Sequence, residues 1–186
     1  MLISEDYRKQ QEQLHENPDY GTASVGFAPF VTRIINETGV TQLLDYGAGK
    51  GRLASSIKPG RPVEVIHYDP ARPDWAQAPD PCEMVCCIDV LEHIEPECLD
   101  DVLDDLQRVT TGIGFFTVHT GPAKKVLADG RNAHLIQKPY RWWLPKFINR
   151  FDLNLFQQTP NGFFVVVYGD HNLHRTEDSR RIVVAS

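Results

Sequence analysis

The chain alternates two kinds of hydrophobic pattern. In one, apolar residues recur every three to four positions, which is typical of a helix that buries one face. In the other, short runs are apolar almost throughout, which is typical of a strand inside a parallel sheet. Helices are predicted at 4–15, at 26–39, from about 52, at 96–110 and at 140–151. Strands are predicted at 41–47, 63–69, 83–89 and 113–119, followed by two β-rich runs at 153–159 and 163–169.

Several of these elements have recognisable ends. Ser4 is predicted to cap the first helix, and Gly39 is predicted to end the second. Pro145 is expected to interrupt the last helix, because proline has no backbone N–H and its ring clashes with the preceding turn. The sequence Thr-Pro-Asn-Gly at 159–162 predicts a turn that pairs the two final runs as an antiparallel hairpin.

The order of these elements predicts the fold class. Alternating strands and helices form a parallel sheet with helices on both faces, and the closing hairpin adds an antiparallel edge. We therefore expect an α/β, doubly wound, Rossmann-like domain that spans 1–186. Its N-terminal helical cap is expected at 1–38 and a polar tail at 170–186.

Composition and charge narrow the function classes. The 186 residues are 41% hydrophobic and 10% aromatic, and no apolar run reaches the roughly 20 residues that span a bilayer. The first 20 residues lack the apolar core of a signal peptide, so we expect a cytoplasmic protein without membrane contact. The net charge of −6 argues against a nucleic-acid partner, whose phosphates would need lysine and arginine. The four cysteines include no Cys-x-x-Cys pair and are expected in the core.

The segment "LLDYGAGKGRLA" at 43–54 places a glycine loop between a strand and a helix. Such a loop lets a ligand approach the backbone closely. A dinucleotide fingerprint would need a third glycine where Arg52 stands, and a phosphate loop would need Ser or Thr after Lys50, where Gly51 stands. Both of these readings are disfavoured.

The loop resembles motif I of the class I S-adenosylmethionine-dependent methyltransferases. Two further segments match that family in the same order: "VIHYDP" at 65–70 ends the second strand with an acid, and "CIDVLEHIEP" at 87–96 is similar to the family's segment after the fourth strand. The resemblance implies a methyltransferase with S-adenosyl-L-methionine as cofactor. It also implies a set of cofactor-binding residues: Tyr20, Asp45, Gly47, Ala48, Gly49, Asp69, Pro70, Asp89 and Val90.

The chain departs from the family after Asp69. Only "PARPDWAQAPDPC" separates this acid from the next strand, where the family usually has a helix and a further strand. We therefore expect a shortened sheet. Trp75 could stack on the adenine or cover the sheet edge, and the sequence leaves both open.

The acceptor is predicted to be a small molecule, a nucleotide derivative or a sugar. The Pro-Pro-Tyr and Pro-Cys motifs of base-methylating DNA enzymes are absent from the position after the fourth strand. Glu92, His93 and His134 are the candidate catalytic residues, since a histidine can take a proton near neutral pH. Asp89, Glu92 and His93 have a spacing that could converge on a metal, but we expect none.

The long connection at 119–143 is expected to shape the acceptor pocket. It is locally basic in an acidic protein, which favours an anionic acceptor. His119, Arg131 and Asn132 are its candidate substrate-binding residues, although Arg131 could instead pair with Asp129. Two other function classes stay open: a degenerate methyltransferase fold that serves as a partner subunit, and a nicotinamide-dependent oxidoreductase, which Arg52 disfavours.

Overall fold

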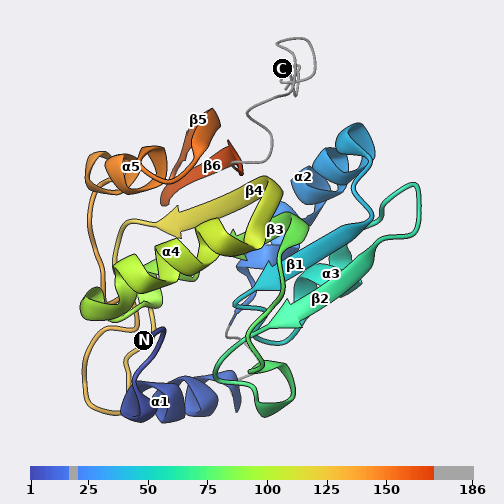
Figure 1. Ribbon diagram of the computed structural model, residues 1–186. Helices are drawn as coiled ribbons and strands as arrows, with labels where there is room; N and C mark the ends of the chain where they lie inside the picture. Colours follow the sequence, from blue (N-terminus) through green and yellow to red (C-terminus); the bar gives the residue numbers. More distant parts are fainter. Residues whose placement is uncertain (17–20, 170–186) are drawn as a thin grey trace.

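The computed structural model describes residues 1–16 and 21–169, and these ranges form one six-stranded sheet with helices around it (Figure 1). The strands are β1 (Gln42–Tyr46), β2 (Glu64–Tyr68), β3 (Cys82–Ile88), β4 (Thr110–His119), β5 (Asp152–Thr159) and β6 (Gly162–Tyr168). Their order is β2-β1-β3-β4-β6-β5; β1 to β4 are parallel, and β6 is antiparallel to both neighbours. The predicted Rossmann-like sheet with a closing antiparallel hairpin is confirmed.

The helices begin and end close to where their sequence signals stand. They are α1 (Glu5–Glu16), α2 (Ala23–Thr38), α3 (Arg52–Ser56), α4 (Leu99–Val109) and α5 (Tyr140–Ile148), with short 3₁₀ turns η1 (Pro73–Trp75), η2 (Leu91–His93) and η3 (Pro96–Cys98). Before α1, the Ser4 hydroxyl accepts the backbone N–H of Tyr7 at 3.3 Å. After α2, Gly39 adopts φ +77° and ends the helix as predicted.

The predicted interruption at Pro145 is wrong. Helix α5 continues through Pro145, which lies on the exposed side. The proline removes one backbone donor, but the carbonyl that loses it belongs to exposed Arg141, where water can bond it instead. Buried Trp143 and Phe147 hold the helix against the sheet on its other side.

Two hydrophobic clusters cover the two faces of the sheet, as the alternating pattern predicts. Helices α2 and α3 pack on one face through Val31, Ile34, Ile35 and Leu53. Helices α4 and α5 pack on the other through residues such as Leu103, Leu106, Trp143 and Phe147. The cysteines, all four of them within the described ranges, are buried as expected: Cys82, Cys86, Cys87 and Cys98.

The sheet is shortened after its second strand, as the sequence predicts. β2 is an edge strand, and only η1 lies between it and β3. Trp75 packs on the ring of His67 with centroids 4.5 Å apart, and it is not among the residues that line the cavity described below. This placement favours the role of Trp75 as a cover for the sheet edge.

The chain order places a switch point at β1, because β2 lies on one side of it and β3 on the other. Ligands of doubly wound sheets bind at the carboxyl ends of the strands beside such a point. Helix α1 lies beyond these ends, apart from the helices on the two faces (Figure 1). Of the predicted cap at 1–38, α1 covers this end of the sheet, whereas α2 packs on its face. In the described part of the chain, no helix combines the length and apolarity needed to cross a membrane.

Candidate active site

A cavity of about 790 Å³ opens at the carboxyl ends of the parallel strands. Its walls come from the glycine loop, the turn after β2, the end of β3, the loop after β4 and the N-terminal segment with α1. Eight of the nine residues predicted to bind the cofactor line it: Asp45, Gly47, Ala48, Gly49, Asp69, Pro70, Asp89 and Val90. Tyr20, the ninth, lies outside the described residues.

The glycine loop is fixed by backbone conformation and by close packing. Gly47 adopts φ +80°, and a Cβ at this position would lie 2.5 Å from a methyl carbon of Val90. The amides of Gly47 and Ala48 both donate to the carbonyl of Tyr68, at 2.8 and 3.0 Å. Only glycine satisfies both constraints at position 47. A Cβ on Gly49 would meet nothing closer than 3.9 Å, so the space beside that residue is open.

Asp69 connects the loop to the end of β2. Its carboxylate accepts the N–H of Gly49 at 2.7 Å and the N–H of Ala71 at 2.9 Å. The residue is only 6% exposed, yet it lines the cavity. Each carboxylate oxygen has two acceptor sites, so Asp69 can hold the loop and still accept hydrogen bonds from a ligand.

Two further acids lie at the ends of β1 and β3. Asp45 is 4% exposed, and burial raises the pKa of its carboxyl group, although His67 at 3.8 Å opposes the shift. Asp89 adopts φ +51°, a conformation that is rare outside glycine. The Thr117 hydroxyl donates to the Asp89 carboxylate and accepts its backbone N–H. A strained backbone held by a neighbouring side chain is typical of functional positions.

The predicted catalytic residues come together beside the cavity: His93 and His134 line its wall, whereas Glu92 is fully buried behind them and does not line it. Glu92 and His93 lie in η2, a single 3₁₀ turn directly after β3. His134 comes from the loop after β4, and its ring meets that of His93 edge-on with centroids 4.7 Å apart. His119 contacts the other side of His134, also at 4.7 Å. Burial lowers the pKa of His93 to about 3, with a further contribution from His134.

Asn132 and Arg131 are not among the residues that line the cavity. Asn132 instead fixes the loop, because its side chain accepts the N–H groups of Ala123 and His134 and donates to the Ala123 carbonyl. Arg131 pairs with Asp129, its Nε lying 2.8 Å from a carboxylate oxygen. The structure therefore shows the alternative that the sequence left open, in which Arg131 pairs with Asp129.

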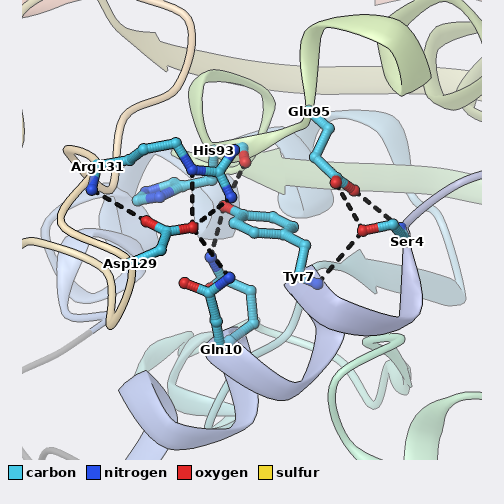
Figure 2. Close-up of polar contacts among 8 residues, drawn as sticks. Ser4, Tyr7, Gln10, His93, Glu95, Asp129 and Arg131 are labelled. Carbon is cyan, nitrogen blue, oxygen red and sulfur yellow. Dashed lines mark hydrogen bonds and ion pairs between the residues drawn. The ribbon is translucent and has the colours of Figure 1, made fainter.

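Helix α1 is fastened over the cavity by polar contacts (Figure 2). The Tyr7 hydroxyl donates to the backbone carbonyl of His93. The Ser4 hydroxyl and N–H both donate to Glu95, at 2.6 and 2.8 Å. Gln10 donates to Asp129 at 3.1 Å.

Several cavity residues were not found by sequence reasoning. Tyr7, Gln11 and His15 all line the cavity from α1. Their spacing of four residues puts them on one helical face, which is the signal that could have identified them. Lys124 and Lys125 also line the cavity.

Comparison with known proteins gives a family match. The family model described as a methyltransferase domain matches residues 15–159. This range contains the glycine loop, the acids at 45, 69 and 89, and the three histidines at 93, 119 and 134. Among curated proteins, none matches the sequence.

Solved structures share the fold at low sequence identity. One is the 1,6-didemethyltoxoflavin-N1-methyltransferase of Burkholderia thailandensis, with bound 1,6-didemethyltoxoflavin and S-adenosylhomocysteine; it has 15% identity, a TM-score of 0.62, and 91% coverage of each chain. DhpI in complex with SAH has 15% identity, a TM-score of 0.55, and coverage of 89% of this chain and 94% of that one. The 16S rRNA methylase ArmA has 14% identity, a TM-score of 0.54, and coverage of 86% and 90%.

Proposed function

This chain belongs to the methyltransferase-domain family, and we propose that it transfers a methyl group to an oxygen or nitrogen atom of a small-molecule acceptor. S-adenosylmethionine is the cofactor of this fold, and when bound it supplies an electrophilic methyl group on a sulfonium. The acceptor's lone pair forms the new bond to carbon, the carbon–sulfur bond breaks, and the acceptor loses a proton. The chain's own residues have to bind both partners and help that proton leave.

The proposed cofactor site is the half of the cavity between β1, β2 and β3. The positive φ of Gly47 and the open space at Gly49 make a cradle for a ligand that lies against the backbone. We propose that Asp69 accepts the two ribose hydroxyls and that Asp45 faces the methionine amine. An ammonium group beside buried Asp45 would offset the cost of ionising that carboxyl. Tyr20, Pro70, Asp89 and Val90 complete the proposed cofactor set.

The proposed acceptor site is the other half, beside the three histidines. We propose that His119, with Lys124 and Lys125, binds the acceptor, and that Glu92, His93 and His134 act on its nucleophilic atom. Two lysines on the cavity wall suit an acceptor that carries phosphate or carboxylate. Arg131 and Asn132, which we first considered as ligands of the acceptor, are proposed to act by shaping the loop.

One observation carries the proposal of a small acceptor: α1 lies across the cavity and is fastened to the segments that follow β3 and β4. Ser4, Tyr7 and Gln10 hold it to Glu95, His93 and Asp129. The cavity volume of about 790 Å³ falls within the range of about 300–1,000 Å³ that is usual for small-molecule sites. A folded RNA would have to displace α1 to reach the same atoms.

The proposal is tested by product analysis. The purified protein is incubated with S-adenosylmethionine and a small-molecule extract, and mass spectrometry searches for S-adenosylhomocysteine and for a product heavier by one CH₂. The Asp69→Ala variant, which lacks the proposed ribose contact, serves as control. Turnover that requires added RNA instead of the small-molecule fraction would contradict the small acceptor. Tight cofactor binding without turnover in either fraction would favour the alternative, a partner subunit without catalysis.

A further inference from the structure

Three side chains of the acceptor half converge on one point. Glu92 and His93 come from η2, and His134 comes from the loop after β4. One ligand atom of each, a carboxylate oxygen or a ring nitrogen, lies within 4.8 Å of the other two. Metal bonds of about 2.0–2.2 Å hold neighbouring ligand atoms about 3–3.5 Å apart. A side-chain adjustment of about an ångström would therefore bring these three atoms into one coordination sphere.

Glu92 supplies an independent reason to expect a cation. Its side chain is 0% exposed, and one carboxylate oxygen accepts the backbone N–H of His119 at 3.0 Å. The other oxygen, Oε2, is buried and has no hydrogen-bond partner among the described residues. Burying such an acceptor without a partner costs free energy. A positive charge at the centre of the cluster would remove that cost.

Both histidines are oriented as metal ligands usually are. Nδ1 of His93 lies 2.8 Å from the carbonyl oxygen of Ala133, and Nδ1 of His134 lies 2.7 Å from that of Gly121. A carbonyl oxygen only accepts, so each Nδ1 carries the proton and donates it. This tautomer places the lone pair on Nε2, the atom that can bind a metal, and a backbone carbonyl on the other nitrogen is the usual support of a ligating histidine.

We infer that Glu92, His93 and His134 bind one divalent transition-metal ion at the acceptor end of the cavity. Two imidazoles and one carboxylate suit Zn²⁺, Mn²⁺, Fe²⁺ or Co²⁺ better than Ca²⁺, which prefers oxygen ligands alone. Three protein ligands leave coordination positions open, as catalytic metal sites do. Sequence reasoning considered Asp89, Glu92 and His93 as the ligand set and favoured no metal; it did not include His134.

The role of this ion rests on the proposed function. A metal held at this point would act as a Lewis acid on an acceptor hydroxyl and lower its pKa, so that the proton leaves to water; the oxygen would then form the bond to the methyl carbon as the carbon–sulfur bond of the sulfonium breaks. The inference thereby narrows the acceptor to a molecule with a hydroxyl group. It also assigns His93 and His134 as ligands in place of a general base.

The site is tested with Co²⁺ alone, added to protein that has been treated with a chelator. We expect one equivalent to bind, with the visible absorption of a Co²⁺–imidazole complex. Glu92→Gln and His134→Gln should each weaken this binding by at least about tenfold, since loss of even a supporting residue costs that much. Glu92→Gln keeps the shape of the side chain and the oxygen that accepts the backbone N–H of His119, so this variant should fold. The matched control is His67→Gln, which removes a histidine outside the cluster whose Nδ1 faces Asp45 at 3.8 Å.

The outcomes separate the metal site from the methyl transfer. Wild-type protein that binds no stoichiometric Co²⁺, or variants at 92 and 134 that bind it as the wild type does, would overturn the site. Methyl transfer that continues unchanged in excess chelator would overturn the assigned role of the ion. A protein that binds Co²⁺ as expected but turns over no S-adenosylmethionine would contradict the proposed function and leave the metal site standing.

Discussion

At the scale of single residues, Gly47 combines a backbone requirement with a packing requirement. Its φ of +80° costs other residues about 1–2 kcal/mol, and an added Cβ would overlap Val90 at 2.5 Å. We expect Gly47→Ala to displace the loop from its place beside Val90 and to weaken binding of S-adenosylhomocysteine by at least about tenfold. Isothermal titration calorimetry measures this loss.

Gly130→Ala is the matched control for that substitution. Gly130 has a similar φ of +87°, but nothing lies within 4 Å of an added Cβ, and the residue is not part of the cavity wall. It should lose only the conformational cost of positive φ, about 1–2 kcal/mol in urea unfolding, while keeping wild-type cofactor affinity. If both variants lost affinity equally, the effect of Gly47→Ala would be one of general stability.

Asp45 gives a residue-scale prediction about pH. Because burial raises its pKa in the folded state, the folded protein holds this proton more tightly than the unfolded chain does. The bound proton of Asp45 therefore stabilises the folded state fully below the unfolded pKa of about 3.9, and this stabilisation is lost as pH rises through the raised pKa. Asp45→Asn should therefore be more stable than the wild type at pH 7, and its stability should not fall as pH rises through the raised pKa. The variant should also bind S-adenosylhomocysteine more weakly. Urea unfolding across pH measures the first effect, and lower stability of the variant at pH 7 would contradict it.

The residues that sequence could predict are those whose chemistry depends on backbone geometry within one segment. Gly47, Asp69 and Asp89 follow strands directly, so their place at the sheet edge is fixed by the strand that precedes them. Arg131 shows the opposite case. Its neighbour Asp129 was visible in the sequence, but whether Arg131 faced the cavity or the surface depended on how a long loop folds back on α1.

At the scale of elements, α1 is the part whose function depends most on tertiary contacts. The Tyr7 hydroxyl donates to the His93 carbonyl and accepts from Gln11, and both bonds are sheltered from solvent. Tyr7→Phe removes the hydroxyl from both hydrogen bonds, which should lower the free energy of opening α1 by about 1–3 kcal/mol. We expect amide exchange in α1 to rise by roughly five- to a hundredfold, as measured by hydrogen–deuterium exchange.

Arg8→Gln is the control on the same helix. Arg8 pairs with Glu5 and Glu12, both within α1, so its loss should cost only a few tenths of a kcal/mol. Exchange in the loop at 123–135 should rise in Tyr7→Phe and stay unchanged in Arg8→Gln. An equal response of that loop to both substitutions would mean that α1 is not held there by Tyr7.

Most elements follow from the local hydrophobic pattern, and the exceptions depend on tertiary contacts. The strands are apolar runs bounded by polar or glycine-rich segments, so their limits were predicted within a few residues. Pro145 was expected to interrupt α5, but the burial of Trp143 and Phe147 outweighs one missing backbone bond. The N-terminal segment was predicted as a helical cap at 1–38, but the residues of α1 that face the cavity, Tyr7, Gln11 and His15, were not identified.

At the scale of the whole molecule, the cavity is a junction between parts that are distant in sequence. Its walls include α1, the glycine loop, the ends of β2 and β3, and the loop after β4. A cofactor that touches several of these walls at once binds only the folded chain. Its binding free energy therefore adds to the free energy of unfolding of the whole domain.

We expect S-adenosylhomocysteine to raise the thermal midpoint of the whole protein in a single transition. At a concentration of 100 times Kd the stabilisation is about 2.7 kcal/mol, which for a chain of this length corresponds to about 5–10 °C. Differential scanning calorimetry measures the shift, and Asp69→Ala should reduce it at the same concentration because the ribose contact is lost. NAD should produce no shift, since Arg52 stands where a dinucleotide loop needs its third glycine. A shift with NAD and none with S-adenosylhomocysteine would contradict the assignment of the cavity to a sulfonium cofactor.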